Sequence, residues 1–124
     1  MKRTLRNFLV CALLTAASGP AMSEPFDGVW QLGGGPFVIV DQNGANFLAI
    51  HLPANMGYWE AFFGNINANN VGVVSLLFSP YLTTYSATVR FQSSSQGTLT
   101  VTNCTPAANC ILQTGQSAVL RKVY

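Results

Sequence analysis

The sequence predicts an all-β protein, an antiparallel up-and-down meander of about eight strands that forms a curled sheet or a small barrel. Runs rich in Val, Ile, Phe, Tyr and Thr recur about every twelve residues beyond residue 23, and clusters of Gly, Asn, Pro or Ser separate them. The same region lacks the apolar periodicity of an amphipathic helix. Because the connections between the runs are short, sequential hairpins are simpler than a Greek key.

The first residues of the chain have the character of an export signal. A basic start precedes an apolar run over residues 8–17, which Ser18-Gly19-Pro20 interrupts. The run is too short to cross a bilayer of roughly 30 Å as a helix, so no membrane span is expected. We therefore interpret residues 1–23 as a signal peptide and residues 24–124 as one secreted domain in the periplasm or outside the cell.

The charges beyond the leader are few and nearly balanced. The leader carries three of the six basic residues and none of the four acidic ones. The remaining charged residues are Arg90, Arg121, Lys122, Glu24, Asp27, Asp41 and Glu60. This balance provides no basic patch for nucleic acid, so we expect no nucleic-acid partner.

Each strand is assigned to one apolar run. In chain order the expected strands are 28–32, 36–42, 46–52, 58–66, 71–78, 83–91, 98–103 and 118–124. Gly33-Gly34-Gly35 precedes a strand and not a helix, so it favours a bend over a phosphate-binding loop. Asn43-Gly44 suits a two-residue hairpin turn.

The turns also predict which side chains share a face. Asn43-Gly44 places Ile39 opposite Leu48, and a loop at 53–56 places Ile50 opposite Trp59. Turns at 67–70 and 79–80 then extend the same face to the sixth strand. The expected interior, which is also the candidate lining of a ligand cavity, comprises Phe37, Ile39, Leu48, Ile50, Trp59, Phe63, Leu76, Tyr85 and Phe91. These side chains either fill an eight-strand barrel or enclose a small apolar ligand.

The alternate residues are expected on the outer wall. Val38, Val40, Phe47, Val73 and Leu77 would make part of this wall apolar, either as ordinary outward residues or as a contact surface for a second copy or another partner.

Three polar residues also fall on the predicted outer wall. His51 would lie opposite Tyr58 and diagonal to Glu60, which makes a cross-strand surface contact the simpler interpretation and a small surface site the alternative. His51 is the only histidine, so the sequence offers no Ser-His-Asp arrangement. We expect no enzymatic activity, no cofactor and no metal site.

The cysteines predict one disulfide. Cys11 lies in the leader, which leaves Cys104 and Cys110 as a pair in an oxidising compartment. The residues between them include the turn formers Pro106 and Asn109, so the bridge is expected to clip a loop between two strands.

The chain resembles the calycin superfamily of lipocalins, fatty-acid-binding proteins, avidins and bacterial metalloprotease inhibitors. The resemblance is carried by Gly28-Val29-Trp30 on the first strand, the eight-strand meander and Arg121 in "VLRKVY". It implies that Trp30 packs against Arg121, or alternatively Lys122, and closes one end of the barrel. The sequence is shorter than that of most lipocalins, and we expect no counterpart of the helix that follows the barrel in that family.

Three functions are compatible with this reading. A non-enzymatic binding module for a small apolar molecule or a protein is the first, because the lining is apolar and catalytic groups are scarce. An inhibitor of an exported protease, with residues 24–26 as an inserting arm, is the second. A self-associating envelope protein is the third.

Overall fold

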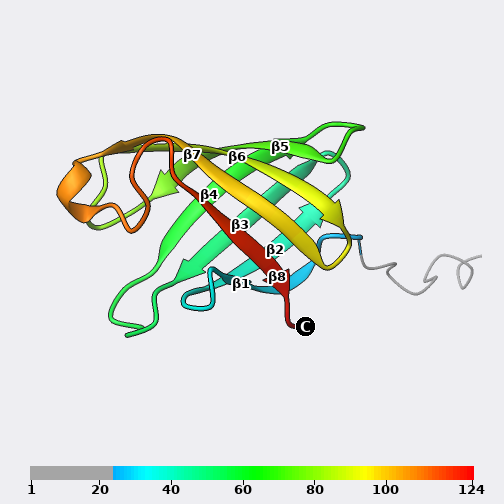
Figure 1. Ribbon diagram of the computed structural model, residues 1–124, viewed down its shortest axis with the longest axis horizontal. Helices are drawn as coiled ribbons and strands as arrows, with labels where there is room; N and C mark the ends of the chain where they lie inside the picture. The colour runs from blue at the N-terminus through cyan, green and yellow to red at the C-terminus, as the bar shows by residue number, and fades with distance from the viewer. Residues whose placement is uncertain (1–23) are drawn as a thin grey trace, which may run out of the picture.

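The computed structural model describes residues 24–124, which form a closed antiparallel barrel in which the strands follow chain order (Figure 1). The predicted signal peptide lies outside the described residues. The elements are β1 (Gly28–Leu32), β2 (Phe37–Asn43), β3 (Asn46–Leu52), β4 (Glu60–Ile66), β5 (Val71–Phe78), β6 (Thr84–Ser93), β7 (Gln96–Thr105), the 3-10 helix η1 (Ala107–Asn109) and β8 (Ser117–Lys122). Within the described part of the chain, no helix is long and apolar enough to cross a membrane.

The barrel confirms the predicted all-β meander. β1 pairs with β8 as well as with β2, so the sheet closes on itself. The β7–β8 connection, which carries η1, lies at the end of the barrel opposite the point where the coloured part of the chain begins (Figure 1). The two ends of the barrel are therefore built differently.

The predicted pairings are off by two residues for β2–β3 and for β3–β4, which leaves the faces unchanged, and off by one residue for β4–β5. Phe63 was expected opposite Val74, but Gly64 takes that position. The turn is longer than expected because the Asn67 side chain accepts hydrogen bonds from the backbone N–H groups of Asn69 and Val71, at 2.9 and 3.1 Å. A shift of one residue exchanges the two faces of a strand. The predicted interior is consequently correct for β5 and β6 and inverted for β2 to β4.

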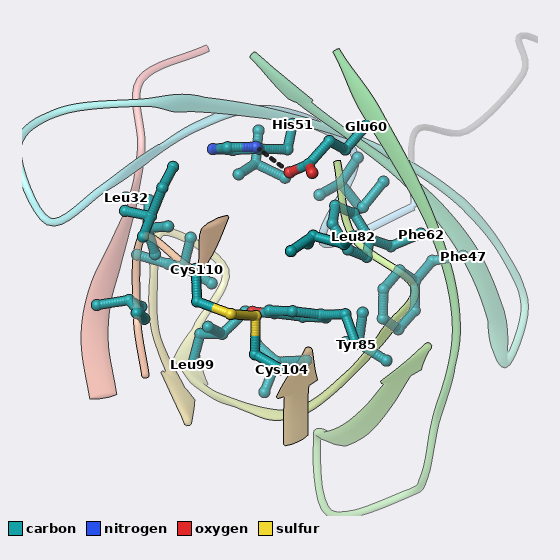
Figure 2. Close-up of a pocket in the computed structure, with 18 of the residues that line it drawn as sticks. Leu32, Phe47, His51, Glu60, Phe62, Leu82, Tyr85, Leu99, Cys104 and Cys110 are labelled. Carbon is teal, nitrogen blue, oxygen red and sulfur yellow. Dashed lines mark hydrogen bonds and ion pairs between the residues drawn. A yellow bond between two sulfur atoms is a disulfide. The ribbon is translucent and has the colours of Figure 1, made fainter. Parts of the chain in front are cut away.

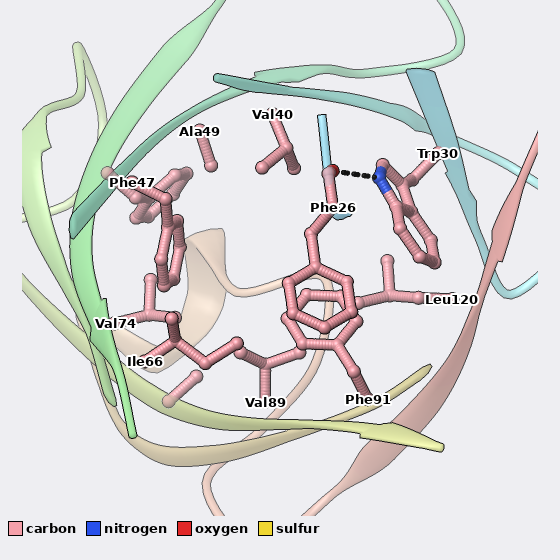
Figure 3. Close-up of a cluster of buried hydrophobic side chains, with 12 residues drawn as sticks. Phe26, Trp30, Val40, Phe47, Ala49, Ile66, Val74, Val89, Phe91 and Leu120 are labelled. Atoms are coloured by element: carbon pink, nitrogen blue, oxygen red, sulfur yellow. Dashed lines mark hydrogen bonds between the residues drawn. The ribbon is translucent and has the colours of Figure 1, made fainter. Parts of the chain in front are cut away.

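An aromatic cluster fills the end of the barrel near residue 24 (Figure 3). Trp30 is completely buried, and its indole Nε1 donates a 2.9 Å hydrogen bond to the backbone oxygen of Phe26. Phe26 stacks on Phe91 with 4.0 Å between ring centroids, and Trp30 lies 5.2 Å from the same ring. We call Phe26, Trp30 and Phe91 the plug.

The cationic side chain that lies over the Trp30 ring is that of Lys122, not Arg121. Lys122 lies directly opposite Trp30 across β1 and β8, so the two side chains share a face, whereas Arg121 is opposite Gln31 and exposed. The Lys122 Nζ lies 5.9 Å from the Trp30 ring centroid. The predicted Trp30–Arg121 pair is therefore wrong, and the alternative partner is the one in place.

The ring of Phe47 covers two glycines inside the barrel. Gly64 lies opposite Phe47, and a Cβ added there would approach the ring Cζ to 2.2 Å. A Cβ on Gly72 would lie 3.2 Å from the same ring. The absence of side chains at both positions gives the Phe47 ring its space against β4 and β5.

Candidate ligand-binding site

An apolar cavity of about 90 Å³ lies between the plug and the β7–β8 loop (Figure 2). Val40, Ala49, Phe62 and Val74 are among the side chains that line it along the barrel wall. Leu82, Ile111 and Leu112 line it from the loops. The cavity is only partly enclosed, so a molecule held in it can extend toward these loops.

The lining differs from the predicted set in the first half of the barrel. Tyr85 and Phe91 line the cavity, and Leu76 packs against the core, as expected. The six other predicted residues do not line it: Phe37, Ile39, Leu48, Ile50, Trp59 and Phe63. Trp59 and Phe63, for example, are 49% and 46% exposed.

On β2 and β3, the side chains that point into the barrel are instead ones that the sequence analysis placed on the outer wall. Val38, Val40 and Phe47 line the cavity, while Val73 and Leu77 lie outside as expected. Trp30 is the sequence feature from which these inward residues could have been identified. A buried Trp30 directly opposite Val38 requires Val38 to point inward, and the alternation of β2 and β3 follows from it.

His51 and Glu60 lie inside the barrel and not on its outer wall. The two residues are direct partners across β3 and β4, and their side chains are joined by a 3.0 Å contact between Nδ1 and Oε2. Residue exposure is only 6% for His51 and 5% for Glu60. The prediction of a surface contact is therefore wrong, because it relied on the inverted face.

Tyr58 is separate from this pair. It lies before β4 begins, is half-buried and packs edge-on against Tyr81 with 4.8 Å between ring centroids. Burial, followed by the negative charges of Glu60 and Tyr81, raises the pKa of its hydroxyl. Tyr58 is not among the residues that line the cavity.

Glu60 is held as a carboxylate. Its Oε1 accepts a 2.6 Å hydrogen bond from the Ser79 hydroxyl, whose oxygen in turn accepts the backbone N–H of Leu82 at 2.9 Å. Burial alone raises the pKa of Glu60, but the hydrogen bonds from His51 and Ser79 and the attraction of His51 bring it below its ordinary value. The Glu60 carboxyl group of the buried pair is consequently ionised at neutral pH.

This carboxylate determines the tautomer of neutral His51. An ionised carboxylate only accepts hydrogen bonds, so Nδ1 carries the proton and Nε2 presents a lone pair. Nε2 is the one buried side-chain nitrogen or oxygen in residues 24–124 that has no hydrogen-bond partner. Figure 2 shows this nitrogen on the side of the ring away from Glu60.

Tyr85 adds a neutral hydroxyl on the other side of the cavity. Its ring packs on Phe62 at 5.0 Å and extends toward the disulfide (Figure 2). Burial and, second, the charge of Glu60 raise the pKa of Tyr85 to about 12. The hydroxyl therefore stays protonated over the whole physiological range.

The disulfide holds the loop at the cavity end. Cys104 and Cys110 are bonded, as predicted, across six positions of sequence, and both line the cavity. The Asn109 amide donates a 2.9 Å hydrogen bond to the backbone oxygen of Tyr81, which ties this loop to the β5–β6 connection. The disulfide and this hydrogen bond thus hold the β7–β8 loop against the wall of the cavity.

His51 and Glu60 are side chains of kinds that bind metal ions, but residues 24–124 contain no cluster of three or more His, Cys, Asp or Glu side chains suited to a metal ion.

No protein-family model, curated protein or solved structure matches the chain. Fold and cavity define it as a small antiparallel β-barrel with a partly enclosed apolar interior, an architecture compatible with the calycins.

Proposed function

We propose that this protein is an exported, non-enzymatic binding module of calycin type that takes a small apolar molecule into the barrel. The observation that carries the proposal is the apolar cavity between the plug and the disulfide-held loop. Pockets of this kind, apolar with a few convergent polar groups, are the usual small-molecule sites of proteins.

The size of the cavity limits the ligand. An apolar cavity of about 150 Å³ is known to hold benzene, and this one measures about 90 Å³. The enclosed part of the ligand is therefore a compact group such as a small ring or short alkyl chain. Any larger portion lies between the loops that contain Leu82 and Ile111.

The polar pair favours binding over catalysis. A histidine oriented by a carboxylate has the form of a general base, but paired acid–base catalysis also uses an acid whose pKa lies near the operating pH. Tyr85, with a pKa of about 12, is a weak acid at neutral pH. The pair is better suited to orienting a bound molecule than to transforming it.

Calorimetric titration with 4-ethylphenol tests the proposal. Ala49→Ile places a larger side chain in the cavity, and we expect it to weaken binding at least about 10-fold. Leu48→Ile, one residue away on the outward face, is the matched control and should bind like the natural protein. Absence of saturable binding, or equal binding by both variants, would exclude the cavity as the site.

Residues 24–26, the expected inserting arm of a protease inhibitor, lie at the end of the barrel next to the plug. Phe26 is 6% exposed and stacked on Phe91, so residues 24–26 lead into the plug. The segment is therefore part of the barrel end, and nothing in its geometry favours insertion into a protease.

Self-association is a second candidate, favoured by the outer face of β2 to β5. Ile39, Leu48, Phe63 and Val73 are between 37% and 60% exposed, and Leu48 lies opposite Phe63 across neighbouring strands. A face that is apolar and nearly uncharged is complementary to a second copy of itself. Sedimentation velocity should then show a dimer that Phe63→Gln dissociates and Val119→Gln, on β8, does not. A monomer at all concentrations would rule this candidate out.

A further inference from the structure

We propose that the ligand is an uncharged molecule with one hydroxyl group, an alcohol or a phenol, which donates its hydrogen bond to His51 Nε2. This inference rests on the proposed function, because it assigns the chemical class of the molecule that enters the cavity. It starts from His51 Nε2, the one buried side-chain nitrogen or oxygen of residues 24–124 without a hydrogen-bond partner, which belongs to a cavity-lining residue.

The hydrogen-bond chain behind His51 makes Nε2 an acceptor. Ser79 donates to one oxygen of Glu60, and Nδ1 of His51 donates to the other. A carboxylate has no proton to return, so the direction of the chain is fixed from Ser79 and His51 toward Glu60. A ligand at Nε2 of the neutral imidazole must therefore supply a donor.

The charge of Glu60 disfavours an anionic ligand. This charge already acts across the cavity, since it contributes to the raised pKa of Tyr85. A carboxylate ligand would add a second negative charge in apolar surroundings, where repulsion is little screened. A free ammonium group would lose its hydration among apolar side chains while both Glu60 oxygens are already hydrogen-bonded. A neutral hydroxyl avoids both costs.

A ligand reaches Nε2 by a small rearrangement of the lining. The atom is shielded from solvent in the structure, with less than 1 Å² accessible. Rotamer changes at binding sites are common, and most side chains that line the cavity are apolar and have no hydrogen bonds to break. Binding then replaces an unsatisfied buried nitrogen by a hydrogen-bonded one, which favours the hydroxyl ligand over its analogues.

The decisive experiment uses the full chain and compares ligands that share an ethylbenzene core and differ in the para substituent. The series is 4-ethylphenol, 4-ethylanisole, ethylbenzene, 4-ethylbenzoate and 4-ethylbenzylamine, each measured by calorimetry. The anisole retains the oxygen but cannot donate. We expect the phenol to bind about 10-fold more tightly than the anisole and ethylbenzene, and the two ions to bind most weakly.

Two variants test the named atoms. His51→Asn keeps an amide N–H in place of Nδ1 for Glu60 but removes Nε2, so the preference for phenol should vanish while ethylbenzene still binds. Glu60→Gln removes the carboxylate that fixes the proton on His51 Nδ1, so both neutral tautomers become accessible. The preference for the phenol should therefore decrease. Imidazole ¹⁵N shifts of the unliganded protein should report the Nδ1–H tautomer in the natural chain and a mixture in Glu60→Gln.

The outcomes separate this inference from the proposed function. If phenol, anisole and ethylbenzene bind equally, the cavity binds apolar molecules but the hydroxyl assignment is wrong and water satisfies Nε2. Tightest binding of the benzoate or the amine also overturns the assignment. If none of the five binds, the proposed function itself fails, whatever tautomer the ¹⁵N shifts report.

Discussion

Gly64→Ala tests whether the inward face of β4 is correctly assigned. The new Cβ would lie 2.2 Å from Cζ of Phe47 and 2.7 Å from the backbone oxygen of Val73. Carbon atoms in contact are about 3.5–4.0 Å apart, so the ring has to retreat by about 1.3 Å. Phe47 is only 6% exposed, and the oxygen belongs to the paired strand β5, so neither neighbour yields freely.

The expected cost is that of overpacking a core, about 2–3 kcal/mol. For a domain of this size each kcal/mol lowers the melting temperature by about 4–8 °C, so we expect a fall of about 10 °C or more. The ring retreats toward the cavity, which it also lines, so affinity for 4-ethylphenol should fall as well.

Thermal unfolding followed by circular dichroism measures the effect. Gly35→Ala is the matched control, because its nearest neighbour, the Leu32 oxygen, would be 3.8 Å from the new Cβ. Phe47→Leu should cost less in the Gly64→Ala background than in the natural chain, because it removes the clashing ring. A Gly64→Ala protein that melts within about 1 °C of the natural one would refute the assignment of this face.

Three further predictions concern pH and the loop. Tyr85 ionises near pH 10 when unfolded and at about 12 in the barrel, so stability should fall by about 2 kcal/mol as pH rises through this window, and Tyr85→Phe should flatten that decline in urea titrations. Glu60 has a lowered pKa, so its contribution to the free energy of unfolding is present above its ordinary pKa of 4.5 and is lost as pH falls through the folded pKa. Glu60→Gln should therefore reduce the loss of stability at acidic pH, measured by the same urea titrations. Reduction of Cys104–Cys110 should cost about 2 kcal/mol for so short a loop and weaken ligand binding, with identical melting of reduced and oxidised protein as the contrary result.

The fold was predictable because its signals are local and repeated. Every strand begins and ends within a few residues of its apolar run, and turn residues such as Gly44 lie between neighbouring runs. The disulfide followed from the count and spacing of Cys104 and Cys110. None of these inferences required knowledge of which side of a strand faces inward.

The site was not predictable by the same route, because it depends on that side. One additional residue in the turn after Ile66 reversed the inferred orientation of β2, β3 and β4. Apolar residues occupy both faces of β2 and β3, so composition gave no warning of the error. The inverted face then placed His51 and Glu60 outside, although polar groups are tolerated inside a barrel when they are hydrogen-bonded to each other. Trp30, the bulkiest inward side chain, was the better reference point.

The junction between β1 and β8 has a consequence for folding kinetics. Gln31 pairs with Arg121, so the last seam of the sheet joins residues from opposite ends of the domain. Pairings between such distant segments form slowly, and folding dominated by them typically takes milliseconds to seconds. Until β8 docks, β1 and β7 each present an unpaired edge to other chains. The interval before that seam forms is when a newly synthesised molecule is most exposed to aggregation.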